Sequence, residues 1–179
     1  MRRILLSLAV VALLALPAAT SAGAAGAGKP GFLVVRKAQS DGGLNGPAVI
    51  TVVVQGFVLG RASQEAQVDV YHLPSVAGGG GPQASGLDVR QTPVHWRTST
   101  GTRFSGTRYT GSNFRFRAIG GAYRVVIHGS GVYLFAGGEG FVTLHGSSLF
   151  PRDDGRYSLG GRPFRSLPPA SVKLKIGRG

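Results

Sequence analysis

GAYRVVIHGSGVYLFAGGEGFVTLHGS, residues Gly121 to Ser147, contains three short apolar runs separated only by glycine-rich segments. The runs are Ala122 to His128, Val132 to Ala136 and Phe141 to His145. Runs of β-branched and aromatic residues with such short joints predict adjacent antiparallel strands. The middle run is apolar at every position, which predicts a strand covered on both faces. We therefore expect a three-stranded meander at the centre of the domain, with Glu139 at the tip of a glycine turn.

Further runs of the same character lie on both sides of this centre. The longest, Ala48 to Arg61, has Gly56 in its middle, which predicts a bend and a run that serves two sheets in succession. This succession of short strands predicts an all-β fold, an antiparallel β-sandwich or jelly roll, with a closed β-barrel as the alternative. The other predicted strands are 32–37, 67–73, 89–98, 102–109, 112–118, 157–159, 162–165 and 172–176.

The N-terminus has the pattern of a secretory signal peptide. Arg2 and Arg3 precede an uncharged run, Ile4 to Leu16, that is shorter than the about 20 residues of a membrane-spanning helix. An uncleaved membrane anchor is the alternative. We expect a signal peptide at 1–22, a small-residue linker at 23–31 and a single all-β domain at 32–177, with a mobile glycine-rich loop at 74–87. The protein is thus predicted to be secreted or associated with the cell envelope.

The chain is basic and contains no cysteine. Twenty Lys and Arg residues and seven Asp and Glu residues give a formal charge of +13, which becomes +11 without Arg2 and Arg3. Without cysteine, disulfides, thiol nucleophiles and thiolate metal sites are excluded. The charge favours an anionic partner such as an envelope polymer, lipid head groups, a polysaccharide or nucleic acid. The alternative is that the charge only keeps the protein soluble.

Glycine spacing near the C-terminus resembles that of a known group of proteins. The run YRVVIHGSGVYLFAGGEGFVTLHGS, followed by DGRYSLGGRPFRSLP, resembles uncharacterised secreted all-β proteins of high-GC Gram-positive bacteria. In that group, three strands separated by Gly-x-Gly segments precede a Gly-x-Tyr-Ser-leucine element. The resemblance covers about the last 60 residues and implies a fold and a location but no activity.

Catalytic patterns are weak in this chain. It has no Gly-x-Ser-x-Gly motif, and its few carboxylates are not placed as the pair that glycoside hydrolysis needs. His128 and His145 end equivalent runs and could meet across neighbouring strands, but two imidazoles alone make a weak metal site. We therefore predict no catalytic residue, no metal site and no cofactor, and we favour a protein that is not an enzyme.

The arginines of two predicted strands form the best candidate site. If Thr110-Gly111 is a hairpin turn, the arginines on either side of it share one face, and Phe114 and Phe116 lie on the reverse. Guanidinium groups bind phosphate and sulfate oxygens in a bidentate manner. The predicted anion-binding residues are Arg108, Arg115 and Arg117, with Arg103 and Arg124 nearby in the sequence.

These observations favour a non-enzymatic secreted β-domain that binds an anionic surface or polymer at the cell envelope. One alternative is a small extracellular enzyme that acts on an envelope polymer through Glu139 or a histidine. The other is a purely structural secreted domain. The sequence carries no specific nucleic-acid-binding motif.

Overall fold

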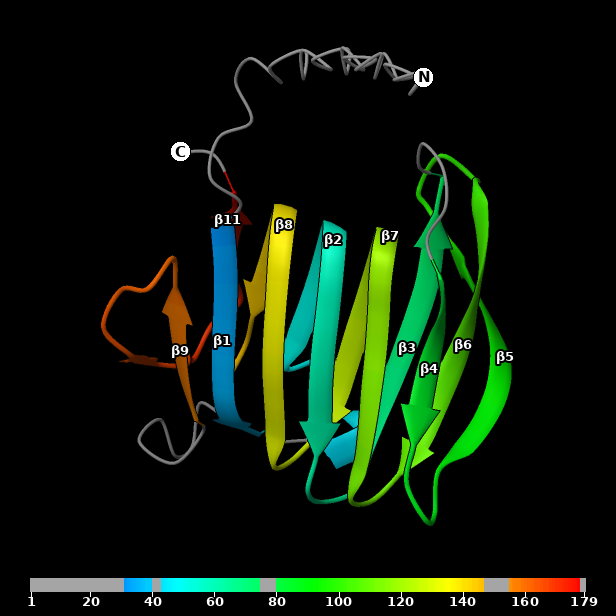
Figure 1. Cartoon of the computed structure of the whole chain (residues 1–179), viewed down its shortest axis with the longest axis horizontal. Coiled ribbons are helices and arrows are strands. Elements are labelled where there is room, and N and C mark those ends of the chain that lie inside the picture. Colours follow the sequence, from blue (N-terminus) through cyan, green and yellow to red (C-terminus); the bar gives the residue numbers. More distant parts are fainter. Residues whose placement is uncertain (1–30, 40–42, 75–79, 147–154, 178–179) are drawn as a thin grey trace, which may run out of the picture.

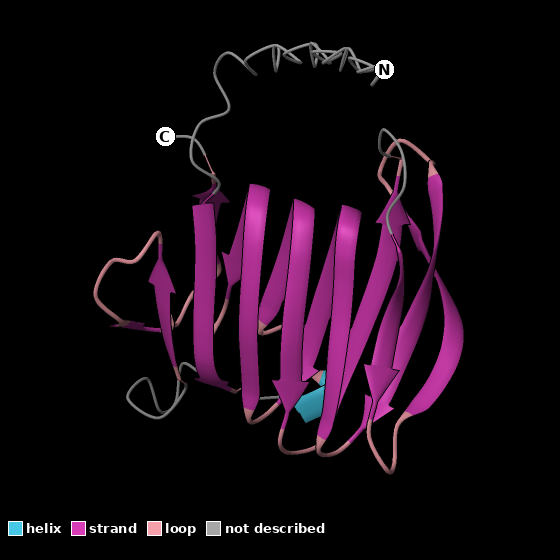
Figure 2. Ribbon diagram, viewed as in Figure 1, coloured by secondary structure: helices cyan, strands magenta, loops and turns pink. Residues whose placement is uncertain are grey.

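The computed structural model describes residues 31–39, 43–74, 80–146 and 155–177, which form an all-β domain (Figure 1, Figure 2). The predicted signal peptide and residues 23–30 of the predicted linker lie outside the described residues. The described residues contain one 3-10 helix, Gly43–Asn45, and eleven strands: β1 (Gly31–Ala38), β2 (Ile50–Ala62), β3 (Ala66–Leu73), β4 (Gly80–Ser85), β5 (Arg90–Arg97), β6 (Arg103–Gly111), β7 (Phe114–Gly129), β8 (Val132–Leu144), β9 (Arg156–Leu159), β10 (Arg165–Ser166) and β11 (Val172–Ile176).

The strand β2 lies between β7 and β8 and is antiparallel to both. The order across the sheet is β10-β9-β1-β8-β2-β7-β3-β6-β5, with β11 paired to β8 and β4 paired to β7. The predicted meander of three consecutive strands is therefore wrong. β7 and β8 follow each other along the chain, but β2 separates them in the sheet.

The short connection between β7 and β8 requires the long strands to bend. Ile127 and Val132 are five residues apart along the chain and can be separated by at most about 18 Å. They nevertheless lie opposite the two ends of β2, which would span about 43 Å if its 13 residues were straight. The sheet therefore folds over on itself, and Figure 1 shows β8, β2 and β7 passing from one layer to the other at the top of the view.

Two layers result, and each long strand contributes one half to each of them. We call the front layer β9, β1, residues 132–137 of β8, 57–62 of β2, 114–119 of β7, and β4. The back layer is β11, residues 139–144 of β8, 50–55 of β2, 122–129 of β7, β3, β6 and β5. The predicted antiparallel β-sandwich is thus confirmed. Within the described residues the sheet is open, ending at β10 and β5, so the alternative of a closed barrel is not formed.

A row of glycines marks the line along which the sheet folds over. Its members are Gly31, Gly138, Gly56 and Gly121, which lie opposite one another on β1, β8, β2 and β7. Gly56 and Gly138 have φ values of +153° and +130°, and a Cβ at either would overlap the backbone carbonyl of a neighbouring strand. The bend predicted at Gly56 is confirmed. The predicted turn at residues 137–140 is wrong, because these residues continue β8 through the bend.

The core fills the space between the two layers. Its members include Val52, Val58 and Leu134, each at most 3% exposed. Burial of a side chain of this size contributes about 1.5–3 kcal/mol. Phe135, next to Leu134, points to the opposite face and is 42% exposed. The prediction that the run Val132 to Ala136 is covered on both faces is therefore wrong, since only its inner face packs against the second layer.

Strand β4 lies within the segment 74–87 that was predicted to be a mobile loop. Two tyrosine hydroxyls hold this strand: Tyr109 donates to the carbonyl of Pro82 (2.8 Å) and Tyr123 to the carbonyl of Gly80 (2.7 Å). Burial raises the pKa of both tyrosines, so their hydroxyls remain donors to a higher pH than that of an exposed tyrosine. The acceptors of these hydrogen bonds are backbone carbonyls, which every residue has. The composition of the segment therefore gives no sign that it is held in place. Residues 75–79 of the predicted loop lie outside the described residues.

Candidate anion-binding site

The structure does not bring the five predicted arginines onto one face. The predicted hairpin at Thr110-Gly111 is not formed, because β3 lies between β6 and β7 in the back layer and residues 112–113 lead into the front layer. Arg103, Arg108 and Arg124 consequently belong to the back layer. Arg115 and Arg117 belong to the front layer, with Phe114 and Phe116 buried behind them as predicted.

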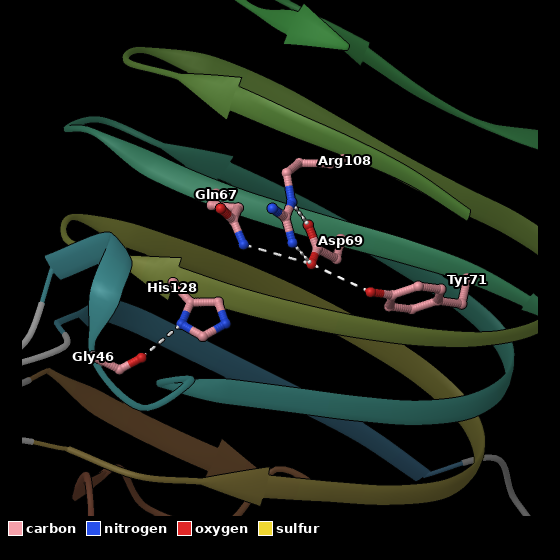
Figure 3. Close-up of polar contacts among 6 residues, drawn as sticks. All are labelled: Gly46, Gln67, Asp69, Tyr71, Arg108 and His128. Carbon is pink, nitrogen blue, oxygen red and sulfur yellow. Dashed lines mark hydrogen bonds and ion pairs between the residues drawn. The ribbon is translucent and has the colours of Figure 1, made fainter. Parts of the chain in front are cut away.

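Arg108 is held by an acidic partner on the neighbouring strand (Figure 3). Its Nε and one terminal nitrogen donate to the two carboxylate oxygens of Asp69, both at 2.7 Å. Tyr71 donates to the same carboxylate at 3.3 Å, and Gln67 does so at 3.5 Å. The hydrogen bonds to Asp69 raise the pKa of Arg108, while burial and the nearby Asp69 raise the pKa of Tyr71. This guanidinium group joins β3 to β6 and is already occupied by a carboxylate.

Replacement of Arg108 by alanine is expected to lower the free energy of unfolding by about 2–3 kcal/mol, because it leaves the carboxylate of Asp69 buried without its cation. Urea denaturation followed by circular dichroism measures this cost. The matched control is Arg103→Ala, an exposed position on the same strand that should change stability by at most about 0.5 kcal/mol. Adding Asp69→Asn to Arg108→Ala should restore part of the loss. Equal costs for the two single variants would show that the ion pair contributes nothing.

The other two predicted arginines that lie in the back layer differ in their surroundings. The guanidinium carbon of Arg124 lies 4.4 Å from the ring centre of Trp96 and 5.7 Å from that of Tyr71. Burial lowers the pKa of Arg124 from its ordinary value. Arg103 is exposed and lies opposite Arg97 at the end of the β5–β6 pair. Neither arginine shares a surface with Arg115 and Arg117.

On the front layer, Arg115 and Arg117 are joined by two arginines that the sequence did not single out. Arg61 on β2 lies opposite Arg115, and Arg36 on β1 lines the same hollow as both of them. We call Arg36, Arg61, Arg115 and Arg117 the front arginine face. Only the insertion of β2 between β7 and β8 brings Arg61 beside Arg115. This pairing has no local signal in the sequence.

Two adjoining hollows lie along the front arginine face. One, of about 440 Å³, is lined by Arg115 and Arg117 with Gln83 and Ser85 of β4. The other, of about 360 Å³, is lined by Arg36, Arg61 and Arg115 and by apolar side chains of β1, β2 and β8. They share Leu59, Gly60 and Arg115, so the face is one continuous surface with two depressions.

Contacts on the front arginine face orient the guanidinium groups without neutralising them. Arg117 donates to the amide oxygen of Gln83, a neutral acceptor. Arg61 lies over the ring of Tyr133 at 4.4 Å, and Arg36 lies over that of Phe164 at 4.3 Å. The acids among the described residues are Glu65, Asp69, Asp88 and Glu139, and none of them lines either hollow. Among the described residues, no acid therefore compensates the charge along these two hollows.

The residues of the enzymatic alternative are dispersed. Glu139 lies in β8 opposite Gln55. The Nδ1 of His128 lies 3.0 Å from the carbonyl oxygen of Gly46 (Figure 3), and that of His145 lies 3.4 Å from the hydroxyl of Ser171. The predicted meeting of these two histidines does not occur, because β2 separates β7 from β8. Within the described residues, no three His, Asp or Glu side chains are grouped as a metal site.

A third hollow contains carboxylates but not Glu139 or a histidine. It has a volume of about 430 Å³ and is lined by Glu65, Asp88 and Arg90 with residues 110–112. In the described part of the chain, no helix is long and apolar enough to span a membrane.

Comparison with known proteins adds no relative. No protein-family model, curated protein or solved structure matches this chain. The resemblance to secreted proteins of high-GC Gram-positive bacteria therefore stays a prediction.

Proposed function

We propose that the protein is a secreted, non-enzymatic β-domain that binds an anionic surface or polymer at the cell envelope through the front arginine face. The observation that carries this proposal is the gathering of Arg36, Arg61, Arg115 and Arg117 on one layer, along two hollows that no acid of the described residues lines. Guanidinium groups suit phosphate, sulfate and carboxylate oxygens, which they bind in a bidentate manner.

The positions of these arginines argue against a role in folding. All four side chains are exposed, and their outward direction follows from strands whose inward residues form the core. Arg108 differs, because it contacts a buried carboxylate. A chain that needed charge only for solubility would gain nothing from placing four arginines side by side, since like charges repel one another. Binding of anions removes this repulsion.

Salt-sensitive binding to long-chain inorganic polyphosphate tests the proposal. The variant Arg61→Gln/Arg115→Gln/Arg117→Gln should lose about 100-fold in affinity at low salt, at roughly 1 kcal/mol per arginine near an anionic surface. The dependence of log K on log salt should become shallower by about one unit for each lost contact. Fluorescence anisotropy with labelled polyphosphate measures both quantities.

The control removes the same number of positive charges from another part of the surface. Arg90→Gln/Arg97→Gln/Arg103→Gln removes three exposed arginines of the β5–β6 pair and leaves the net charge equal to that of the first variant. It should retain most of the affinity. Equal losses in the two variants would reduce the interaction to a general effect of net charge, and the front arginine face would not be a site.

A further inference from the structure

Apolar side chains gather beside the front arginine face. Phe32, Ile119 and Phe135 are between 38% and 47% exposed, although all three are large and apolar. Phe135 lies opposite Val34 on β1 and Leu59 on β2, and Phe57 lies opposite Ile119 on β7. We call this group the front apolar patch: Phe32, Val34, Phe57, Leu59, Ile119 and Phe135.

The three phenylalanines of the patch contact one another. The ring centres of Phe32 and Phe135 are 6.2 Å apart, and those of Phe57 and Phe135 are 5.2 Å apart. None of the three belongs to the buried core between the layers. Contiguous apolar surface with a polar rim marks a site that meets another apolar phase or partner.

On four neighbouring strands, the outward side chains are apolar near the glycine bend and become polar or basic farther from it. Away from the glycine bend, β2 presents Phe57, Leu59 and Arg61, and β7 presents Ile119, Arg117 and Arg115. The corresponding side chains are Phe135 and Tyr133 on β8, and Phe32, Val34 and Arg36 on β1. Along β2, four residues separate Phe57 from Arg61, which is about 13 Å, and Arg117 on β7 lies opposite Leu59 between them.

We propose that the anionic partner is a lipid membrane surface, with the front apolar patch entering the interface and the front arginine face pairing with phosphate head groups. This inference rests on the proposed function and names the partner of the same site. Basic and aromatic side chains arranged in this way are typical of proteins that lie in the membrane interface, where apolar contact and attraction to anionic lipids act together.

Two other occupants of this surface fit less well. A soluble anionic polymer would satisfy the arginines but leave Phe32, Phe135 and Ile119 in water. A second copy that docked through the same face would oppose arginine to arginine, because no acid of the described residues lines that face. A bilayer with anionic head groups satisfies both parts of the surface at once.

Co-sedimentation with phospholipid vesicles tests the inference. We expect binding to vesicles that contain phosphatidylglycerol and little binding to pure phosphatidylcholine. The variant Phe32→Ser/Phe135→Ser should bind anionic vesicles at least about tenfold more weakly, because it removes apolar surface that enters the interface. It should bind polyphosphate as the unchanged protein does. The control Leu87→Ser/Val172→Ser removes two exposed apolar residues outside the patch and should bind vesicles normally.

The outcomes separate this inference from the proposed function. If the phenylalanine variant binds anionic vesicles as well as the unchanged protein, the membrane inference is overturned, whatever the polymer result. If the triple arginine variant keeps its affinity for polyphosphate, the proposed function fails instead. If the unchanged protein forms a dimer in sedimentation velocity that the phenylalanine variant does not form, the patch is an interface between copies and the membrane inference is overturned. Circular dichroism of each variant confirms that the fold is retained.

Discussion

Replacement of Gly138 by alanine is expected to lower the free energy of unfolding by about 4 kcal/mol, combining backbone strain with overpacking. Gly138 has a φ of +130° and lies opposite Gly56, where the sheet folds over. A Cβ at this position would overlap the carbonyl oxygen of Gln55, a backbone atom that cannot rotate away. Urea denaturation followed by circular dichroism measures the loss.

The control for Gly138→Ala is Gly101→Ala. Gly101 also has a positive φ, +88°, but a Cβ there would meet nothing within 4 Å. This control should cost only about 1 kcal/mol, the penalty of the backbone conformation alone. Similar costs at the two positions would mean that the strands do not approach each other closely at the bend, and the folded-over sheet would need revision.

The local pattern of the sequence predicted most of the strands but not their partners. The bend at Gly56 is confirmed, because a glycine inside a long β-branched run has few other uses. The glycines at residues 137–140 were wrongly predicted to form a turn. They lie within β8 and permit close contact with the neighbouring strands. Sequence spacing does not distinguish these two uses. The insertion of β2 between β7 and β8 is a pairing over a long sequence distance and has no local signature.

The prediction of the candidate site was likewise right where it depended on local alternation and wrong where it depended on strand order. Alternation predicted correctly that Arg115 and Arg117 point away from Phe114 and Phe116. The assignment of Arg108 to the same face depended on a hairpin between consecutive strands, and that hairpin is not formed. Arg36 and Arg61 were missed because their place beside Arg115 follows from strand order. Residue types and alternation thus indicated the chemistry, whereas only the topology placed the residues together.

Truncation of Leu134 to alanine is expected to cost about 3 kcal/mol, within the range for large-to-small changes in packed cores. Leu134 is 3% exposed and belongs to the core between the layers. The next residue, Phe135, is 42% exposed, so its truncation removes less buried surface than that of Leu134. We expect Phe135→Ala to cost only about 1 kcal/mol, mainly from its contacts with Phe32 and Phe57. Denaturation midpoints of the two variants, measured side by side, test this contrast.

The difference in expected cost between Leu134→Ala and Phe135→Ala bears on the function of the front apolar patch. If Phe135→Ala costs as little as expected, folding does not explain a large apolar side chain that is 42% exposed beside arginines. A small cost for Phe135→Ala would leave binding as the physical reason for its presence. Equal costs for Leu134→Ala and Phe135→Ala would instead mean that the outer face is also packed. The run Val132 to Ala136 would then be covered on both sides, and the patch would not be available to a membrane.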